Sequence, residues 1–178
     1  MKRFEKQHGD NYITADIESP LAKVKMDIHQ IPFEENMFDA VLCNHVLEHV
    51  QDDIKAMSEI KRVLTPTGKL IVHTMPNTWY YAVGYPLFRL VQRLRGRRLP
   101  SDPRDRWQYK EVHVNEQNPI RLHRALVAAG LTAKVWLQTT QSYDEEPNPY
   151  VRLIMKALVT LYPFRWAFCN DLFAVATS

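Results

Sequence analysis

A strand–helix–strand succession over residues 38–74 constrains the fold of this chain more than any other feature of its sequence. Residues 38–43 are almost continuously apolar, which predicts a strand buried on both faces. Asp52 and Asp53 can cap a helix that runs through Leu64, because its apolar residues recur at helical spacing. A second apolar strand then follows. This order is the repeating unit of a parallel α/β sheet.

The rest of the chain extends this pattern into a single α/β domain over residues 1–178. Thr65-Pro-Thr-Gly68 is predicted to be a turn, and Gly130 is predicted to close a helix over 119–129. Residues 77–116 are rich in arginine, proline and aromatic side chains, and we expect them to form an insertion or lid. Besides residues 38–43, strands are predicted over 11–16, 24–28, 69–74, 132–138 and 171–177.

The composition excludes several classes of protein. None of the five glycines is spaced for a G-x-G-x-x-G motif or a P-loop, so the chain encodes no complete glycine-rich phosphate cradle. Cys43 and Cys169 cannot form a disulfide framework. The net charge of +3 demands no nucleic-acid partner, and the oligomeric state is left open. With no secretory signal and no apolar span, the sequence predicts a cytoplasmic protein.

Two acidic residues lie near the ends of neighbouring predicted strands. Asp16 ends the strand near 11–16, and Asp27 nears the end of the strand over 24–28. In open α/β sheets, ligands bind beyond the carboxyl ends of the strands, where an acid can accept from both hydroxyls of a ribose. A helix cap or a solvated turn acid is the alternative for either residue alone. The pair therefore indicates a nucleoside site more strongly than either residue does.

These acids belong to a longer series of motifs. Asp16 and Asp27 are followed by Ile31-Pro-Phe, by His45-Val-Leu-Glu-His49 and by a helix that ends in Leu64-Thr-Pro-Thr-Gly68. In this order the motifs resemble the class I S-adenosylmethionine-dependent methyltransferases, in their small-molecule, type 11-like branch. The resemblance is dense over residues 11–76 and looser after them. It implies a Rossmann-like, mostly parallel sheet with an antiparallel C-terminal strand.

The resemblance also implies roles for individual residues. Asp16 would hold the ribose of S-adenosylmethionine, Asp27 would accept from the adenine amino group, and Ile28 would supply a backbone contact. Asn44 and His45 would line the methionine and substrate side. If the acceptor must lose a proton, His45 and His113 are the candidate bases by their titration range. The expected reaction is methyl transfer to a small molecule, including lipid-linked or saccharide-related acceptors.

At the front of the chain the sequence departs from the family. The family's first strand and glycine-rich loop have no counterpart before Asn11. We therefore expect an interruption of the sheet between the strands near 11–16 and 38–43, and weak binding of S-adenosylmethionine by this chain alone. The alternative function is a non-catalytic, methyltransferase-like module that binds a partner.

One rival motif points to a metal instead. His45-Val-Leu-Glu-His49 matches the H-x-x-E-H pattern of zinc proteases, in which two histidines on one helical face share a zinc ion. A buried strand ends just before this motif, and no later helix offers an obvious third ligand. The sequence therefore predicts a turn from strand to helix and no bound metal.

Two amphipathic segments remain, over residues 79–99 and 150–165. The first combines an apolar helical face with a face of arginines, which fits a substrate lid, an acidic-ligand site or peripheral contact with a membrane. A packed surface helix with solvated arginines is the alternative. For the second segment, core packing is the simplest interpretation, and a lipid-linked substrate would also suit it. We expect both segments to cover the substrate side of the sheet.

Overall fold

The computed structural model describes residues 11–102, 105, 113–139, 144 and 146–178. Its strands are β1 (Ala15–Asp16), β2 (Val24–Lys25), β3 (Phe38–Asn44), β4 (Leu64–Thr74), β5 (Thr132–Gln138) and β6 (Asp171–Thr177). Its helices and helical turns are η1 (Leu47–His49), α2 (Asp53–Val63), η2 (Tyr80–Gly84), α3 (Tyr85–Leu94), α4 (Pro119–Ala128), α5 (Pro149–Thr160) and α6 (Arg165–Phe168).

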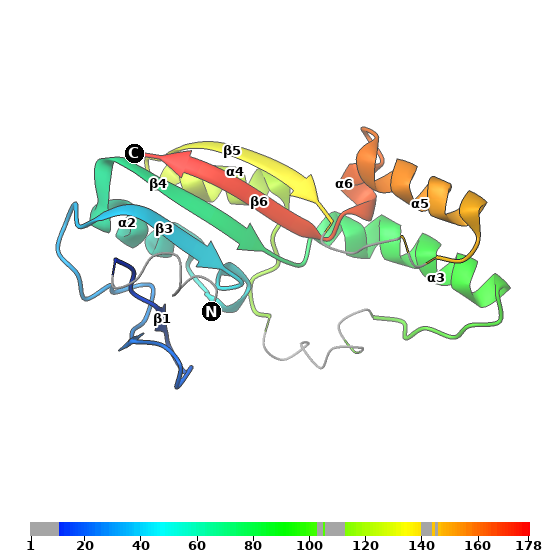
Figure 1. Ribbon diagram of the computed structural model, residues 1–178, viewed down its shortest axis with the longest axis horizontal. Coiled ribbons are helices and arrows are strands. Elements are labelled where there is room, and N and C mark those ends of the chain that lie inside the picture. Colours follow the sequence, from blue (N-terminus) through cyan, green and yellow to red (C-terminus); the bar gives the residue numbers. More distant parts are fainter. Residues whose placement is uncertain (1–10, 103–104, 106–112, 140–143, 145) are drawn as a thin grey trace.

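Four of the strands form one mixed sheet in the order β3-β4-β6-β5 (Figure 1). β3 and β4 are parallel, whereas β6 runs antiparallel to both β4 and β5. The antiparallel C-terminal strand predicted from the family resemblance is thus confirmed. The helix ends before residues 65–68 as predicted, since α2 stops at Val63, but these residues belong to β4, which begins at Leu64. The pairing passes from Leu64 opposite Phe38 to Lys69 opposite Ala40, so residues 65–68 form a bulge opposite Asp39.

The prediction that all six strands share one sheet is wrong. β1 and β2 form a separate parallel pair of two residues each, held by bonds such as Val24 N–H to Thr14 O at 3.0 Å. In the part of the chain that the structure describes, neither strand pairs with β3. The two sheets therefore separate between the strands near 11–16 and 38–43, which is where we expected the interruption.

Side-chain caps determine where the main helices begin. Asp52 accepts from the backbone N–H of Lys55 at the start of α2, and Asn118 accepts from that of Arg121 at the start of α4. Gly130 has a φ of 79° and ends α4 as predicted, because this left-handed conformation is inexpensive only for glycine.

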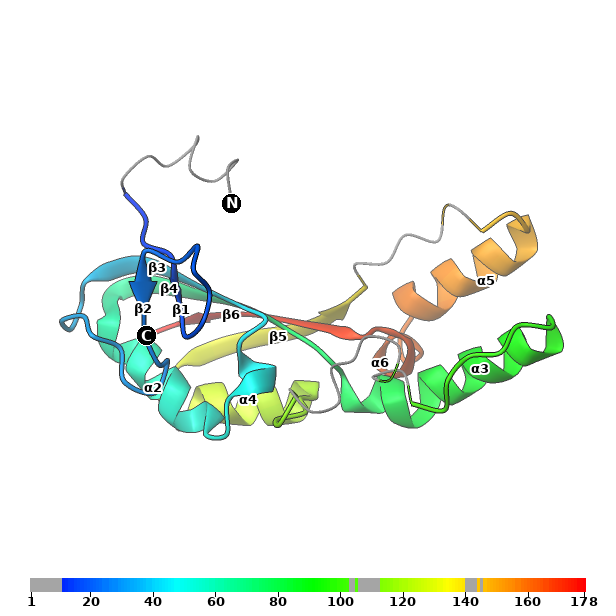
Figure 2. The ribbon, with the colours of Figure 1, turned by 90° about the horizontal axis from the view of Figure 1, so that it is seen from below.

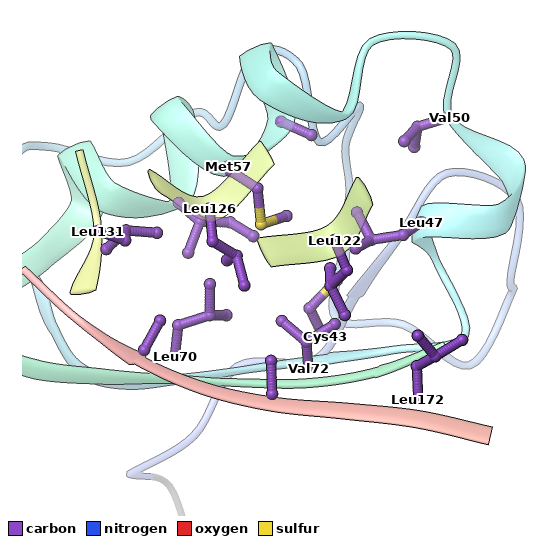
Figure 3. Close-up of a cluster of buried hydrophobic side chains, with 14 of the residues drawn as sticks. Cys43, Leu47, Val50, Met57, Leu70, Val72, Leu122, Leu126, Leu131 and Leu172 are labelled. Atoms are coloured by element: carbon purple, nitrogen blue, oxygen red, sulfur yellow. The ribbon is translucent and has the colours of Figure 1, made fainter. Parts of the chain in front are cut away.

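The core lies between one face of the four-stranded sheet and helices α2 and α4. Figure 3 shows Met57 of α2 and Leu122 and Leu126 of α4 pointing toward Leu70 and Val72 of β4, and all five are fully buried. The opposite face of the sheet is more open, with the side chains of Leu42 and Ile71 exposed. In Figure 2 the described helices α2 and α4 lie on the same side of the sheet.

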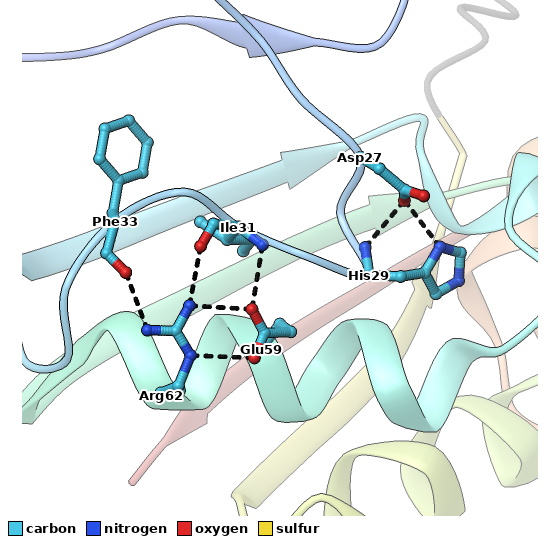
Figure 4. A network of polar contacts seen from close by, with 6 residues as sticks. All are labelled: Asp27, His29, Ile31, Phe33, Glu59 and Arg62. Atoms are coloured by element: carbon cyan, nitrogen blue, oxygen red, sulfur yellow. Dashed lines mark hydrogen bonds and ion pairs between the residues drawn. The ribbon is translucent and has the colours of Figure 1, made fainter.

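An ion pair on α2 fixes the loop that leads into β3. Arg62 bonds the carboxylate of Glu59 at 2.8 Å and donates to the carbonyls of Ile31 and Phe33, each at 2.8 Å (Figure 4). Glu59 also accepts from the backbone N–H of Ile31 at 2.9 Å. The hydrogen bonds from Arg62 hold the pKa of Glu59 below its ordinary value, although burial opposes them. The Ile31-Pro-Phe motif is thus anchored to α2 through its backbone.

Helices α3 and α5 project together beyond the carboxyl end of β4 (Figures 1 and 2). They lie beyond the carboxyl ends of the strands, where ligands bind in open α/β sheets, rather than across a face of the sheet, so their covering of the substrate side stays a prediction. None of the residues of α5 is buried, so core packing accounts for little of its apolar surface, although the partly buried Val159 packs against the core. Among the described residues, no helix combines the length and apolarity needed to cross a membrane.

The bases of these two helices are attached firmly to the sheet domain. The ring of Trp79 stacks on that of Trp166 at 4.6 Å, and the amide of Asn77 donates to the carbonyls of Trp166 and Cys169 at 2.8 and 2.9 Å. Gly84 packs so closely against α6 that an added Cβ would lie 1.9 Å from the carbonyl oxygen of Ala167. The projecting pair therefore has a fixed base.

Candidate functional site

Asp16 ends β1 and has an exposed carboxylate. Its Oδ1 accepts from the backbone N–H groups of Glu18 and Ser19 at 2.9 and 2.8 Å, which forms a tight turn after the strand. The N–H of Ser19, then that of Glu18, holds the pKa of Asp16 below its ordinary value, and His49 adds to the effect. The turn bonds use one carboxylate oxygen, so the second one remains available to accept from ribose hydroxyls.

Asp27 follows β2 and has a similar arrangement. Its Oδ1 accepts from the backbone N–H of His29 at 2.9 Å and lies 2.7 Å from the Nδ1 of the same residue (Figure 4). These bonds hold the pKa of Asp27 below its ordinary value. An ionised, exposed carboxylate of this kind can accept from an adenine amino group. Ile28, the next residue, is half-buried and packs against the core, which fixes the backbone beside Asp27.

Asn44 and His45 lie where β3 ends, as the sequence predicts. The amide oxygen of Asn44 is 2.9 Å from the Nδ1 of His73, on the neighbouring strand. His45 has a φ of 53°, an uncommon conformation for a residue with a side chain. Its backbone N–H donates to the carbonyl of His73 at 2.8 Å, and the two imidazole rings lie 4.3 Å apart. The chain therefore turns sharply away from the sheet at His45.

This turn decides the geometry of the H-x-x-E-H motif. Residues Leu47–His49 form a single 3-10 turn, so His45 and His49 do not share the face of an α-helix as they do in the zinc-protease pattern. His45 instead bonds within the motif, with its Nδ1 3.0 Å from the Oε1 of Glu48. The predicted turn from strand to helix is confirmed.

His113, the other candidate base, lies close to this turn. Its ring packs 5.0 Å from that of His49, at an interplanar angle of 64°. Burial lowers the pKa of His113 below its ordinary value, the charge of Glu48 opposes this shift, and that of His49 adds to it. The structure therefore brings the side chains of His45, Glu48, His49 and His113 close to one another. The charge of His49 also lowers the pKa of Asp16, so this cluster lies on the same side of the molecule as Asp16.

Sequence reasoning missed several residues that hold this region in place. His73 lies 3.1 Å from Asp171 of β6 through its Nε2, and its ring stacks on that of Phe173 at 4.2 Å. Glu48 of the H-x-x-E-H motif has a buried carboxylate, which accepts from the hydroxyl of Thr74 at 2.7 Å. The available signal was His73 itself, a polar residue directly after the apolar run Leu70-Ile-Val of β4.

An open groove of about 600 Å³ lies elsewhere, between α4 and the start of α2. Its lining includes Asp53, Trp79, Arg121 and Arg124, and none of the predicted site residues. Asp16, Asp27 and Asn44 are exposed, so these residues of the predicted site lie at an open edge of the molecule. The thiols of Cys43 and Cys169 do not contribute to it, because burial raises their pKa values to about 12 and about 11.

Part of the chain is similar to proteins of a known family. Residues 2–72 match the family model described as a methyltransferase domain. A 50-residue stretch is 52% identical to an uncharacterized protein of Methanocaldococcus jannaschii, over 28% of this chain and 22% of that protein. A longer stretch of 133 residues is 28% identical to the demethylmenaquinone methyltransferase of Mycobacterium sp. strain KMS, over 72% of this chain and 57% of that enzyme.

The fold has relatives among solved structures. An S-adenosylmethionine-dependent methyltransferase from Mesorhizobium loti superimposes with a TM-score of 0.60 at 16% identity, over 99% of this chain and 85% of that one. At this identity the likeness concerns the fold alone. The chain spans less than two thirds of the length of the two curated relatives, at 22% and 57%. The resemblance stated from the sequence is confirmed by the match over residues 2–72.

Proposed function

We propose that this chain, whose residues 2–72 match the methyltransferase-domain family model, serves methyl transfer from S-adenosylmethionine to a lipid-linked small molecule. The observation that carries the cofactor half is the pair of carboxylates of Asp16 and Asp27, each at the end of one of two parallel strands. The acceptor half rests on the apolar helices α3 and α5.

The two carboxylates suit the adenosine end of the cofactor. Each uses its Oδ1 for the turn that follows its strand, and each has its pKa held below the ordinary value, so both are ionised at neutral pH. An ionised carboxylate can only accept hydrogen bonds, so ribose hydroxyls and an adenine amino group would donate to it. When bound, the cofactor would supply a methyl group made electrophilic by its sulfonium. The chain's own contribution would then be to position the acceptor in line with it.

His45 and His113 remain the candidate bases for an acceptor that must lose a proton. Burial lowers the pKa of His113 and so favours the neutral form, which is the form that accepts a proton. His45 contacts Glu48 through its Nδ1, which favours a fixed ring orientation. Both roles stay predictions.

The acceptor half of the proposal follows from exposed apolar side chains on the projecting helices. On α3, Leu90 is 54% exposed and Leu94 is 80% exposed, and on α5 Tyr150 and Leu153 are 78% and 68% exposed. Arginines 89, 93, 97 and 98 accompany them on or just after α3, and all are exposed. An apolar helical face with arginines beside it suits the interface of an anionic membrane or a lipid-linked anion.

The cofactor half is tested by ligand-observed NMR, which detects weak binding. Saturation-transfer spectra of S-adenosylhomocysteine with the full chain are expected to show transfer to the adenine and ribose protons. Excess S-adenosylmethionine should displace that signal, since both ligands share the adenosine end. Absence of transfer at high protein concentration would overturn this half of the proposal.

If α3 and α5 contact a lipid-linked acceptor, the chain should bind vesicles that contain an anionic phospholipid. This binding should weaken as salt screens the charges of the arginines. Leu94→Glu should reduce the bound fraction about tenfold, because burying a leucine is worth about 1.5–3 kcal/mol. Leu21→Glu is the matched control, since Leu21 is 72% exposed but far from α3 in sequence. Co-sedimentation measures the effect. Equal loss in both variants, or no binding by the unchanged chain, contradicts membrane contact through α3.

A further inference from the structure

Three metal-ligating side chains converge beside the end of β3. Glu48 and His49 come from η1, and His113 comes from the segment that precedes α4. One ligand atom from each residue lies within 4.8 Å of the other two. Two atoms bound to one zinc ion are at most about 4.2 Å apart, since each bond is about 2.0–2.1 Å. Small rotations of the two imidazoles would therefore bring the three atoms onto one ion.

Backbone and side-chain hydrogen bonds hold the segment that carries His113 against η1. The N–H of Asn115 donates to the carbonyl of Glu48 at 3.1 Å, which ties the segment carrying His113 to η1. The side chains of Asn115 and Gln117 in turn point their amides at the carboxylate of Asp53, at 3.5 and 3.1 Å. The ring of His113 consequently packs against that of His49.

The burial of Glu48 is the second observation. Its side chain is 1% exposed, and a buried carboxylate is costly unless it is paired or coordinates a metal. Thr74 donates to its Oε2 at 2.7 Å, and the Nδ1 of His45 lies 3.0 Å from its Oε1. Each carboxylate oxygen carries two lone pairs, so both contacts leave acceptor capacity toward His49 and His113. Hydrogen bonds of this kind orient a ligating carboxylate in metal sites.

We propose that Glu48, His49 and His113 bind one divalent transition-metal ion, which would leave His45 as the candidate base when the ion is bound. Two imidazoles and one carboxylate form a donor set that suits Zn²⁺ and that leaves a fourth position for water or another ligand. His45 and Thr74 position Glu48 from behind and do not bind the ion.

This site differs from the zinc-protease pattern weighed in the sequence. There His45 and His49 would be the ligands and Glu48 a base, whereas here Glu48 is a ligand and His113 replaces His45. The expectation that no metal binds rested on the lack of a third ligand on a later helix. The third ligand comes instead from the irregular segment before α4, which sequence periodicity does not reveal.

The test uses the full chain, freed of metal by a chelator and then dialysed against Zn²⁺. Elemental analysis is expected to find about one zinc ion per chain, and competition with a chromophoric chelator gives the affinity. His49→Ala and His113→Ala should each weaken zinc binding by at least about tenfold, since even loss of an outer hydrogen-bond partner costs about 10–100-fold. The matched control is His123→Ala, because His123 is an exposed histidine on α4.

The two ligand variants keep the test independent of folding. His49 is exposed and can be truncated without opening the core, and circular dichroism checks that each variant retains its helices. Cobalt(II) gives a second readout, because its visible absorption bands report the loss of an imidazole. Zinc retained equally by His49→Ala, His113→Ala and His123→Ala would overturn the proposal. Absence of stoichiometric zinc in the unchanged chain would overturn it as well.

Discussion

Asp16→Asn is expected to weaken binding of S-adenosylhomocysteine about 10–100-fold, because a hydrogen bond to a charged group contributes about 1.5–3 kcal/mol. The substitution separates two roles of one side chain. The amide oxygen of asparagine can still accept from the N–H groups of Glu18 and Ser19, as Oδ1 does at 2.9 and 2.8 Å. The second oxygen becomes an NH₂ group, which cannot accept from a ribose hydroxyl.

A matched control separates this loss from a change in net charge. Glu18→Gln removes one negative charge two residues away, on an exposed side chain that follows the same strand. We expect it to leave the dissociation constant within about twofold, because exposed charges are well screened. Ligand-observed NMR titrations of the full chain measure all three proteins. An equal effect of the two substitutions would show that Asp16 does not contact the ribose.

Asp53→Ala is expected to lower the free energy of unfolding by about 2–4 kcal/mol. The carboxylate of Asp53 accepts from the amides of Gln117 at 3.1 Å and Asn115 at 3.5 Å. Both amides are buried, with Gln117 0% and Asn115 2% exposed. Removing the acceptor leaves these donors unsatisfied away from water, and each such group costs about 1–3 kcal/mol.

Asp52→Ala is the natural comparison, because the two acids are adjacent at the start of α2. Asp52 accepts from the N–H of Lys55 at 2.9 Å as an exposed N-cap, and removing a cap costs about 0.5–2 kcal/mol. Urea denaturation midpoints for the two variants and the unchanged chain decide the order. If Asp52→Ala is the more destabilising change, the buried contacts of Asp53 do not anchor the segment before α4.

Asp53→Ala should also affect the Glu48–His49–His113 cluster. The segment anchored by Asp53 carries His113, so its release should weaken zinc binding in parallel with stability. His49→Ala, by contrast, should weaken zinc binding and leave the urea midpoint nearly unchanged, because His49 is exposed. This contrast separates a ligand from a residue that only positions one.

Local sequence was sufficient for the regular elements of the core. The apolar run that ends in Cys43 is β3, the helical spacing after Asp52 is α2, and Gly130 ends α4 with a φ of 79°. These predictions held because periodicity, capping and glycine conformations are fixed by neighbouring residues. The two acids at strand ends were likewise visible, since Asp16 follows the run Tyr12-Ile-Thr-Ala and Asp27 follows Val24-Lys-Met.

Contacts between distant segments decided the rest. The strands near 11–16 and 24–28 form their own pair, because pairing depends on which edges meet in space. Helix α5 exposes Tyr150, Leu153 and Ile154, although its composition alone fits a core helix equally well. The meeting of Glu48 and His49 with His113 depends on the hydrogen bond from Asn115 to Glu48. The sequence by itself determined the elements and the strand-end acids, whose signals are local. Only the tertiary structure decided the sheet partition and the Glu48–His49–His113 cluster, because long-range pairing leaves no local pattern.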